Sequence, residues 1–270
     1  MSKMKITFLG AGNMAEALVR GVLDGRVCDA SGVTVTDVRP ERLAFFRDNL
    51  KVNAVESNRD AAGQADVVVL AVKPQSLGDL LKELKGAASK DALVLSIAAG
   101  ITTRWIEDRM ENGIRVVRVM PNTPALVGQG VSAICGGRWA GEMDMGTAER
   151  ILGSVGSVVR VAEKDMDAVT ALSGSGPAYV FFLIEAMMKA AADLGLNDVV
   201  ARELVNATVE GSARLIIQTG LDAAELRARV TSKGGTTAAA LGVLAAGGVA
   251  EKWVEAIKAA HHRATELSGG

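Results

Sequence analysis

Short apolar runs rich in β-branched residues alternate with segments of helical hydrophobic spacing over the N-terminal part of the chain. A run that is apolar at consecutive positions predicts a parallel strand buried on both faces, and the segments between runs predict the helices that cover it. The predicted strands lie at residues 5–9, 33–37, 66–72, 91–97 and 114–120, with further candidates at 131–135 and 158–161 on either side of a helix at 142–152. This pattern predicts an α/β domain.

After residue 161 the strand signal stops and helical spacing continues toward the C-terminus. The predicted helices lie at residues 178–194, 199–218, 222–230 and 238–246, followed by a final helix that carries both histidines. We therefore expect an α/β domain over residues 1–162 and an all-helical domain over residues 163–270. Because no Gly/Ser-rich linker marks the boundary, we expect the domains to be packed rather than tethered.

The first strand runs directly into the sequence G-A-G-N-M-A at residues 10–15, where helical spacing begins. Strand, tight turn and helix form the context that a dinucleotide fingerprint requires. Gly10 permits the sharp turn, Gly12 lets the backbone approach a pyrophosphate, and Ala15 takes the small third position. Free amides at the helix start then face an anion. We expect an NAD(P)-binding site here.

Asp37 ends the second predicted strand, about 25 residues beyond Gly12, close to the usual spacing for an acid that accepts from the adenosine ribose. Arg39 follows it and could instead pair with a 2′-phosphate. The two residues favour NAD and NADP respectively, and the sequence leaves that choice open. The segment could also be only a turn and a helix start.

The ends of four predicted strands lead into the segments at residues 10–14, 72–74, 98–100 and 121–124. In an open α/β sheet the ligand lies beyond the carboxyl ends of the strands, so these segments should meet at one edge. Prolines on both sides of Asn122 stiffen its loop, which suits a residue that holds a nicotinamide or a substrate. A rigid loop without a ligand is the alternative.

The segment at residues 173–177, S-G-S-G-P, predicts the start of a long helix, with a serine cap and a proline in the first turn. Within this helix only Glu185, Lys189 and Asp193 are charged, and they form one narrow stripe. A helix that is apolar around most of its circumference is buried on nearly all sides. The helical domain is too small to cover it, so we expect a second subunit to do so.

A second glycine-rich turn, at residues 231–237, leads into another helix and carries three threonines and a serine. Backbone amides and hydroxyls that converge at a helix start suit a small anion, either a carboxylate or a phosphate. An ordinary capped helix is the alternative.

The composition is that of an ordinary soluble protein, with 49% hydrophobic residues and a formal net charge of −1. This balance argues against nucleic acid or an anionic membrane as a partner. Cys28 and Cys135 form no C-x-x-C motif, so neither a disulfide framework nor a metal site is expected. The N-terminus lacks signal-peptide organisation, and the longest apolar run, residues 180–184, is too short to span a bilayer. We expect a cytoplasmic protein.

The sequence offers no obvious catalytic acid. His261 and His262 are adjacent on the final helix among charged residues, which predicts solvated side chains. A two-domain hydroxyacid dehydrogenase needs a lysine early in its first long helix, where this chain has Tyr179 and Val180. A protonated imine carries its own positive charge and accepts hydride without an acid. The missing acid therefore favours C=N over C=O as the bond reduced.

Taken together, these motifs resemble those of Δ1-pyrroline-5-carboxylate reductases over nearly the whole chain. The resemblance rests on five segments: residues 10–15, A-V-K-P at 71–74, M-P-N-T-P at 120–124, L-S-G-S-G-P-A-Y at 172–179 and V-T-S-K-G-G-T-T-A-A-A-L at 230–241. It implies an N-terminal Rossmann domain, an all-helical domain that forms a homodimer, and reduction of a cyclic imine to L-proline by NADPH or NADH.

The resemblance also implies site residues. The expected cofactor contacts are Gly10, Ala11, Gly12, Asn13, Met14, Asp37, Arg39, Asn58, Ala71, Val72, Lys73, Pro74 and Ala99, to which the proline-framed loop adds Asn122. The expected substrate contacts are Ser232, Gly234, Gly235, Thr236, Thr237 and Glu163. The chain departs from the family pattern at Lys233, where many members have proline, and at Arg229, where an amide is common. The first changes the carboxylate loop and the second puts one cofactor contact in doubt.

Two other functions remain as alternatives. One is a β-hydroxyacid-type NAD(P) dehydrogenase, which the missing lysine disfavours. The other is a module that binds NAD(P) without chemistry, which would not need the second glycine-rich turn.

Overall fold

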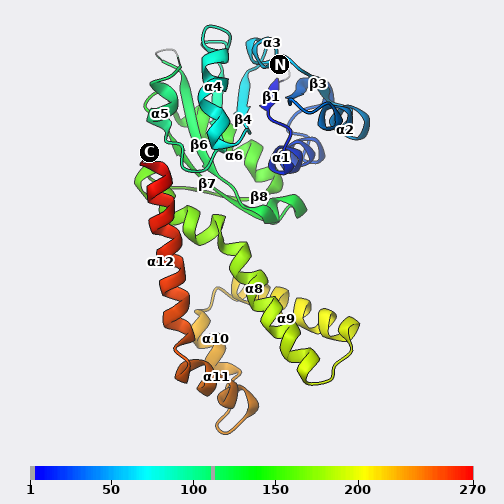
Figure 1. The fold of residues 1–270 in the computed structure, drawn as a ribbon, viewed down its shortest axis with the longest axis vertical. Helices are drawn as coiled ribbons and strands as arrows, with labels where there is room; N and C mark the ends of the chain where they lie inside the picture. Colours follow the sequence, from blue (N-terminus) through cyan, green and yellow to red (C-terminus); the bar gives the residue numbers. More distant parts are fainter. Residues whose placement is uncertain (1–3, 111–112, 270) are drawn as a thin grey trace. The chain divides into compact units, whose positions relative to one another are not determined.

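The computed structural model describes residues 4–110 and 113–269 (Figure 1), and it divides into two compact units. One unit comprises the described residues up to Ser175 together with those from Ala260 onward, and the other is Gly176–Ala259. The first unit extends past residue 162 because the chain stays packed on the sheet there: buried Met166 lies in one apolar cluster with Ala133 and Cys135. The domain boundary after residue 162 remains a prediction.

The first unit is built on one mixed sheet of eight strands in the order β3-β2-β1-β4-β5-β6-β7-β8. The strands from β1 to β6 run parallel, β7 is antiparallel to β6, and β8 is parallel to β7. All predicted strands are present, and β3 is a strand that the sequence did not predict. The bounds are β1 Ile6–Leu9, β2 Val33–Thr36, β3 Asn53–Val55, β4 Val67–Leu70, β5 Leu93–Ser96, β6 Arg115–Met120, β7 Gly130–Gly136 and β8 Gly156–Arg160.

Helices cover both faces of this sheet, with short 3-10 turns at Ala30–Gly32, Thr123–Val127 and Gly153–Val155. One face packs against α1 Asn13–Asp24, α2 Pro40–Leu50 and α6 Glu142–Leu152. The other packs against α3 Asn58–Gly63, α4 Pro74–Leu84 and α5 Thr103–Glu107.

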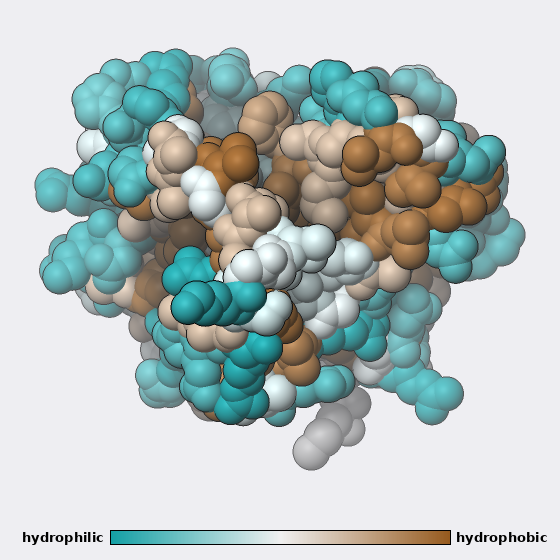
Figure 2. All heavy atoms as spheres, turned by 90° about the horizontal axis from the view of Figure 1, so that it is seen from below, coloured by the Kyte–Doolittle hydropathy of each residue, from teal (hydrophilic) through white to brown (hydrophobic). Residues whose placement is uncertain are grey.

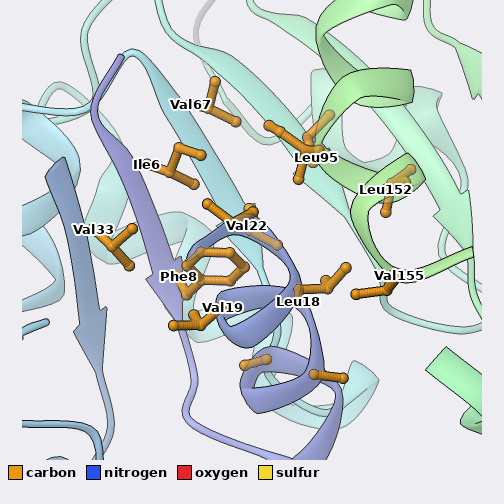
Figure 3. Packing of buried hydrophobic residues seen from close by; sticks show 14 of the residues in the cluster. Ile6, Phe8, Leu18, Val19, Val22, Val33, Val67, Leu95, Leu152 and Val155 are labelled. Carbon is orange, nitrogen blue, oxygen red and sulfur yellow. The ribbon is translucent and has the colours of Figure 1, made fainter. Parts of the chain in front are cut away.

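The core beside α1 explains why the first strand and helix stay together. In Figure 3, Phe8 of β1 lies against Val19 and Val22 of α1, with Leu18 on the same helix toward Val155. All five side chains are buried, and each contributes about 1.5–3 kcal/mol of hydrophobic stabilisation. This packing fixes the turn between β1 and α1.

The chain is already helical before the segment that was predicted to begin a helix. A 3-10 turn at Glu163–Asp165 leads into α7 Met166–Val169 and then into a π-helical turn, Thr170–Gly174. The predicted serine cap is therefore wrong, because Ser175 has αR backbone angles at the end of the π-helical turn and its amide donates to the Thr170 carbonyl at 2.9 Å.

The second unit consists of helices: α8 Gly176–Asp193, α9 Asp198–Thr219, α10 Ala223–Arg229, α11 Thr236–Ala246 and the first part of α12 Val249–Ser268. The sequence predicted each of them. α8 packs on α9, yet Phe181 and Phe182 are 57% and 66% exposed. α11 has no buried residue among its described positions. Broad hydrophobic patches are visible in the view from below (Figure 2).

One helical stretch in the described ranges, Glu163–Asp193, is long and apolar enough to cross a membrane by length and composition alone. It is longer than the apolar run at residues 180–184 because α8 continues from the helical residues before it, which the sequence did not predict.

Candidate functional site

The carboxyl ends of β1, β4, β5 and β6 lie along one edge of the sheet, as predicted. Their parallel register aligns Leu9 with Leu70, Leu70 with Ser96, and Ser96 with Arg118. The strand order reverses direction between β1 and β4, which is the switch point where an open α/β sheet binds its ligand. The segments predicted to contact a dinucleotide therefore begin at a common edge.

Gly10 makes the turn out of β1 possible. Its φ is +108°, and a Cβ atom there would lie 2.6 Å from the carbonyl oxygen of Ala71. Its amide donates to the Thr36 carbonyl at 2.9 Å, so the turn lies between the ends of β2 and β4. Any other residue would force this backbone apart.

Gly12 leaves a space at the start of α1. It is the N-cap residue, and no side chain of the described structure caps the helix there. A Cβ atom added to Gly12 would meet no described atom within 4 Å, whereas Ala15 is fully buried against the sheet. The first amides of α1 thus face an open cradle at the positive end of the helix, which suits a pyrophosphate.

The backbone around Ala11 is fixed from both sides. Its amide donates to Asp37 Oδ2 at 2.8 Å, and its carbonyl accepts from Arg42 Nε at 2.7 Å. Arg42 also pairs with Glu16 at 3.0 Å and lies 4.9 Å from the Phe45 ring centre. The sequence did not predict this role of Arg42 and Glu16, because residues on two different helices have no fixed spacing in the chain. Their contacts hold the loop between β1 and α1.

Asp37 and Arg39 form an ion pair at 2.9 Å. Burial alone would raise the pKa of the Asp37 carboxyl, but hydrogen bonds from the Arg39 side chain and from the amides of Ala11 and Arg39 outweigh it and lower the pKa below its usual value. The Asp37 carboxylate therefore stays ionised, and the positive charge of Arg39 partly balances its negative charge. The Arg39 side chain is 51% exposed and has donors to spare.

Asn58 begins α3 and lies next to the end of β2. Its Oδ1 accepts from Thr36 Oγ1 at 2.5 Å, and its Nδ2 donates to Glu83 Oε2 at 3.0 Å. Its predicted cofactor contact remains a prediction.

The loop after β4 lies partly open at the carboxyl edge of the sheet. Ala71 and Val72 are half-buried, Lys73 is exposed at the start of α4, and Pro74 occupies the first turn of that helix. Ala99, after β5, is also exposed. These positions are open to a ligand at the carboxyl edge.

The Asn122 side chain is buried and forms hydrogen bonds within the protein. It is 9% exposed, accepts from the Val131 amide at 2.9 Å and donates to the Ser173 carbonyl at 3.2 Å. The Ser173 carbonyl is available because Pro177, four residues on, has no N–H to donate to it. Asn122 therefore joins the loop after β6 to the π-helical turn, and its contact with a cofactor remains a prediction.

Glu163 is likewise engaged inside the first unit. Its two carboxylate oxygens accept from the amide and the hydroxyl of Thr103 at 2.7 and 2.6 Å. The Arg118 guanidinium lies 3.6 Å from Glu163 and 3.5 Å from Asp167. The predicted contact of Glu163 with substrate has no support in this geometry and stays a prediction. The pKa of the nearby Cys135 thiol is raised to about 12, mainly because the thiol is buried and to a lesser extent because Glu163 is negatively charged.

The second glycine-rich turn lies in the second unit, where it begins α11. Gly234 has a φ of +74°, and Gly235 is the N-cap, with no side-chain cap from the described part of the chain. Ser232 and Thr236 are exposed and Thr237 is half-buried, so hydroxyls and free amides gather at one helix start. The Gly235 amide donates to the Ser232 carbonyl at 3.1 Å, which closes the turn.

The two departures from the family pattern are also placed. Lys233 is exposed within the same turn, and Arg229 pairs with Glu225 at 2.7 Å on its own helix, α10. Arg229 is therefore occupied by a neighbour one turn away.

His261 and His262 are exposed on α12, as predicted, and His262 lies 3.2 Å from Glu266. Across residues 4–110 and 113–269, no group of three His, Cys, Asp or Glu residues could hold a metal ion. Cys28 and Cys135 are both buried, and neither forms a disulfide within the described residues.

Two family models match the chain. Residues 163–267 match the model described as pyrroline-5-carboxylate reductase dimerisation, and residues 5–100 match the model described as NADP oxidoreductase, coenzyme F420-dependent. The first match lies in the C-terminal part of the chain and the second in the N-terminal part.

Curated relatives and solved structures agree with this match. The pyrroline-5-carboxylate reductase of Corynebacterium melassecola is 40% identical over 97% of this chain and 98% of its own, and that of Haemophilus influenzae is 41% identical over 99% and 98%. The reductase structure from Coxiella burnetii has a TM-score of 0.91 at 40% identity, covering 99% of each chain. The Plasmodium falciparum reductase, solved with NADP bound, has a TM-score of 0.91 at 29% identity with the same coverage. The chain belongs to the pyrroline-5-carboxylate reductase family.

Proposed function

We propose that the chain reduces the C=N bond of 1-pyrroline-5-carboxylate to give L-proline, with NADPH or NADH as the hydride donor. The observation that carries this proposal is the uncapped, glycine-lined start of α1 at the switch point of the sheet, in a chain related to these reductases over its full length. Both the fold and the space at Gly12 fit a dinucleotide.

The dinucleotide, when bound, supplies the hydride that the imine carbon accepts. The amides of residues 10–14 would hold its phosphates, and Asp37, Arg39 and Asn58 would meet its adenosine end. The segments at 71–74 and 98–100, together with Asn122, would border its nicotinamide end. The ion pair of Asp37 with Arg39 and the bond from Arg42 to Ala11 keep this loop rigid before the cofactor arrives.

The turn at residues 231–237 would hold the carboxylate of the substrate. Its support is the combination of free amides at the start of α11 with the hydroxyls of Ser232, Thr236 and Thr237. Glu163 would approach the ring nitrogen only if its bonds to Thr103 opened. Because a protonated imine needs no acid from the protein, catalysis depends on holding the two reactants in a reactive geometry, which can contribute about 7–11 kcal/mol.

We propose NADPH as the preferred cofactor. Asp37 is partly neutralised by Arg39, so its repulsion of a 2′-phosphate is reduced, and Arg39 is exposed with free donors. A guanidinium recognises phosphate with two parallel hydrogen bonds. The description of a related reductase with NADP bound is consistent with this preference.

We also propose a cytoplasmic homodimer. Within one chain α8 and α11 leave large apolar side chains in contact with solvent, and the residues involved match a domain described as a dimerisation domain. An exposed apolar surface of this kind marks an interaction site in a protein that is not in a membrane. The same pairing accounts for the apolar length of Glu163–Asp193 without a bilayer.

One assay tests the activity and the cofactor together. Purified protein is mixed with pyrroline-5-carboxylate and either NADPH or NADH, and the absorbance of the reduced nicotinamide is followed alongside proline formation. We expect proline to form, faster with NADPH. Failure with both cofactors, or oxidation of a β-hydroxy acid instead, would overturn the proposal. Light scattering after size exclusion would give the mass of the assembly.

A further inference from the structure

The last turn of α12 touches the loop that follows β5. Gly100 in that loop has a φ of +75°, and a Cβ atom there would lie 3.1 Å from the carbonyl oxygen of Leu267. The two backbones therefore meet with no side chain between them. Both segments belong to the first compact unit, although α12 begins in the second.

The same turn of α12 contacts an ion-pair system whose arginine is buried and whose two carboxylates are partly exposed. Ser268 Oγ donates to Asp167 Oδ2 at 2.7 Å, and Asp167 Oδ1 lies 3.5 Å from Arg118 Nη2. The Arg118 residue is only 4% exposed, on β6. A buried cation depends strongly on each partner, because losing one leaves its charge poorly compensated.

From Arg118 the contacts return to the loop where they began. Arg118 lies 3.6 Å from Glu163, which accepts two hydrogen bonds from Thr103, three residues after Gly100. The contacts thus close into a ring. We call it the C-terminal ring; its members are Gly100, Thr103, Arg118, Glu163, Asp167, Leu267 and Ser268.

The loop that this ring encloses has few contacts of its own. Residues 98–100 are Ala, Ala and Gly, with no polar side chain, and of the three only Ala98 is buried, in the apolar cluster that α4 and α5 share with the sheet. The backbone at Ala99 and Gly100 therefore depends on the residues around it. The proposed function places Ala99 beside the nicotinamide end of the cofactor.

We infer that the C-terminal ring positions this loop for hydride transfer, and that Leu267 and Ser268 are positioning residues for the reaction. The inference rests on the proposed function, because that function assigns the loop to the nicotinamide. A displacement of about 1 Å at a reacting group can reduce the rate a hundredfold, so loss of a support outside the site should reduce kcat. The adenosine end, held at residues 10–14 and 37–39, should be unaffected.

A pair of hydroxyl deletions on the same end of α12 tests this in the full-length protein. Ser268→Ala removes the bond to Asp167. The matched control, Thr265→Ala, removes a hydroxyl that bonds the His261 carbonyl of its own helix at 3.2 Å. For each variant, kcat is measured with saturating pyrroline-5-carboxylate. Calorimetry gives the Kd of NADPH and of 2′-phospho-ADP-ribose, which lacks the nicotinamide.

We expect Ser268→Ala to lower kcat about tenfold, as for loss of one hydrogen bond to a charged group. NADPH should bind more weakly, while 2′-phospho-ADP-ribose should bind as to the wild type. Thr265→Ala should match the wild type in all three values. If Ser268→Ala matched Thr265→Ala, or weakened the fragment as much as NADPH, the inference would be wrong.

A second variant strengthens the test. Asp167→Asn can still accept from Ser268 but no longer pairs its charge with Arg118, and we expect the same separation between NADPH and the fragment. If Asp167→Asn weakened the binding of NADPH and of the fragment equally, the ring would be only a structural support. The two binding measurements need no turnover, so they decide this inference even if the wild type does not reduce pyrroline-5-carboxylate.

Discussion

The amide of Ala11 donates a hydrogen bond to the Asp37 carboxylate at 2.8 Å. Asp37, which the sequence predicts to bind the adenosine ribose, therefore also stabilises the loop that would hold the phosphates. Since the same carboxylate accepts from Arg39, one acidic side chain supports both the phosphate loop and the residue proposed to select the cofactor.

This role of Asp37 gives a pH dependence of stability. The folded-state pKa of Asp37 lies below its ordinary value of 3.8, so its stabilising effect is fully present above the unfolded-state pKa and is lost as pH falls through the folded-state pKa. We expect wild type to exceed Asp37→Asn in urea midpoint at neutral pH and the difference to vanish only in strong acid. The control is Asp48→Asn, on the exposed surface of α2. A difference that closed while the solution was still near neutral would contradict the assignment.

Substitution by alanine should lower the stability of the protein at Gly10 but not at Gly12. Gly10→Ala places a Cβ atom 2.6 Å from the Ala71 carbonyl at a positive φ, so we expect a loss of at least about 2 kcal/mol of stability. Gly12→Ala meets no described atom within 4 Å and should fold normally.

The Gly12→Ala methyl group occupies the cradle at the start of α1, so NADPH should bind at least about tenfold more weakly. Thermal unfolding and NADPH titration of the two variants measure the contrast. Normal cofactor binding by Gly12→Ala would show that the pyrophosphate lies elsewhere.

Arg39→Ala tests the choice of cofactor. Removing a charged donor to a phosphate should raise the KM for NADPH about 10- to 100-fold and leave the KM for NADH nearly unchanged. Arg47→Ala, at an exposed position near the end of α2, is the control for the loss of one positive charge. Equal effects on both cofactors would assign Arg39 to folding of the loop rather than to selection.

Thr237→Ala tests the substrate turn. We expect the KM for pyrroline-5-carboxylate to rise about tenfold, since the variant loses one hydroxyl contact to a carboxylate, while NADPH binding is retained. The paired variant His261→Ala with His262→Ala should retain full turnover, because both side chains are exposed on α12. A loss of kcat in the histidine variant would show that the protein does supply an acid.

Periodicity predicted most of this fold because each element carries its own local signal. The continuous apolar runs of β4 and β5 and the G-A-G-N-M-A turn are local patterns, and the structure has them where the sequence predicted. The antiparallel direction of β7 was not predictable, because a strand's direction depends on its neighbour and not on its own residues. The helical path through residues 163–175 and into α8 was obscured by Gly174, Gly176 and Pro177, since glycine and proline usually interrupt helices.

The site was predictable where the backbone does the binding and less so where side chains bind each other. Gly10 and Gly12 are required by their own conformations and surroundings, so their residue type is informative. Asn122 and Glu163 have types that suit a ligand, but contacts with Ser173 and Thr103, distant in the sequence, engage them within the protein. Arg42 carried no motif, and only its bond to the Ala11 carbonyl identifies its role.

The continuity of α12 has a consequence for how this family can vary in length. Residues 249–259 of this helix belong to the second compact unit, and the residues from Ala260 onward belong to the first. Because each residue turns an α-helix by about 100°, inserting or deleting a single residue between them would turn Leu267 and Ser268 by about that angle relative to the residues of α12 before the change. Natural length changes in this helix should therefore come in whole turns or lie beyond Ser268.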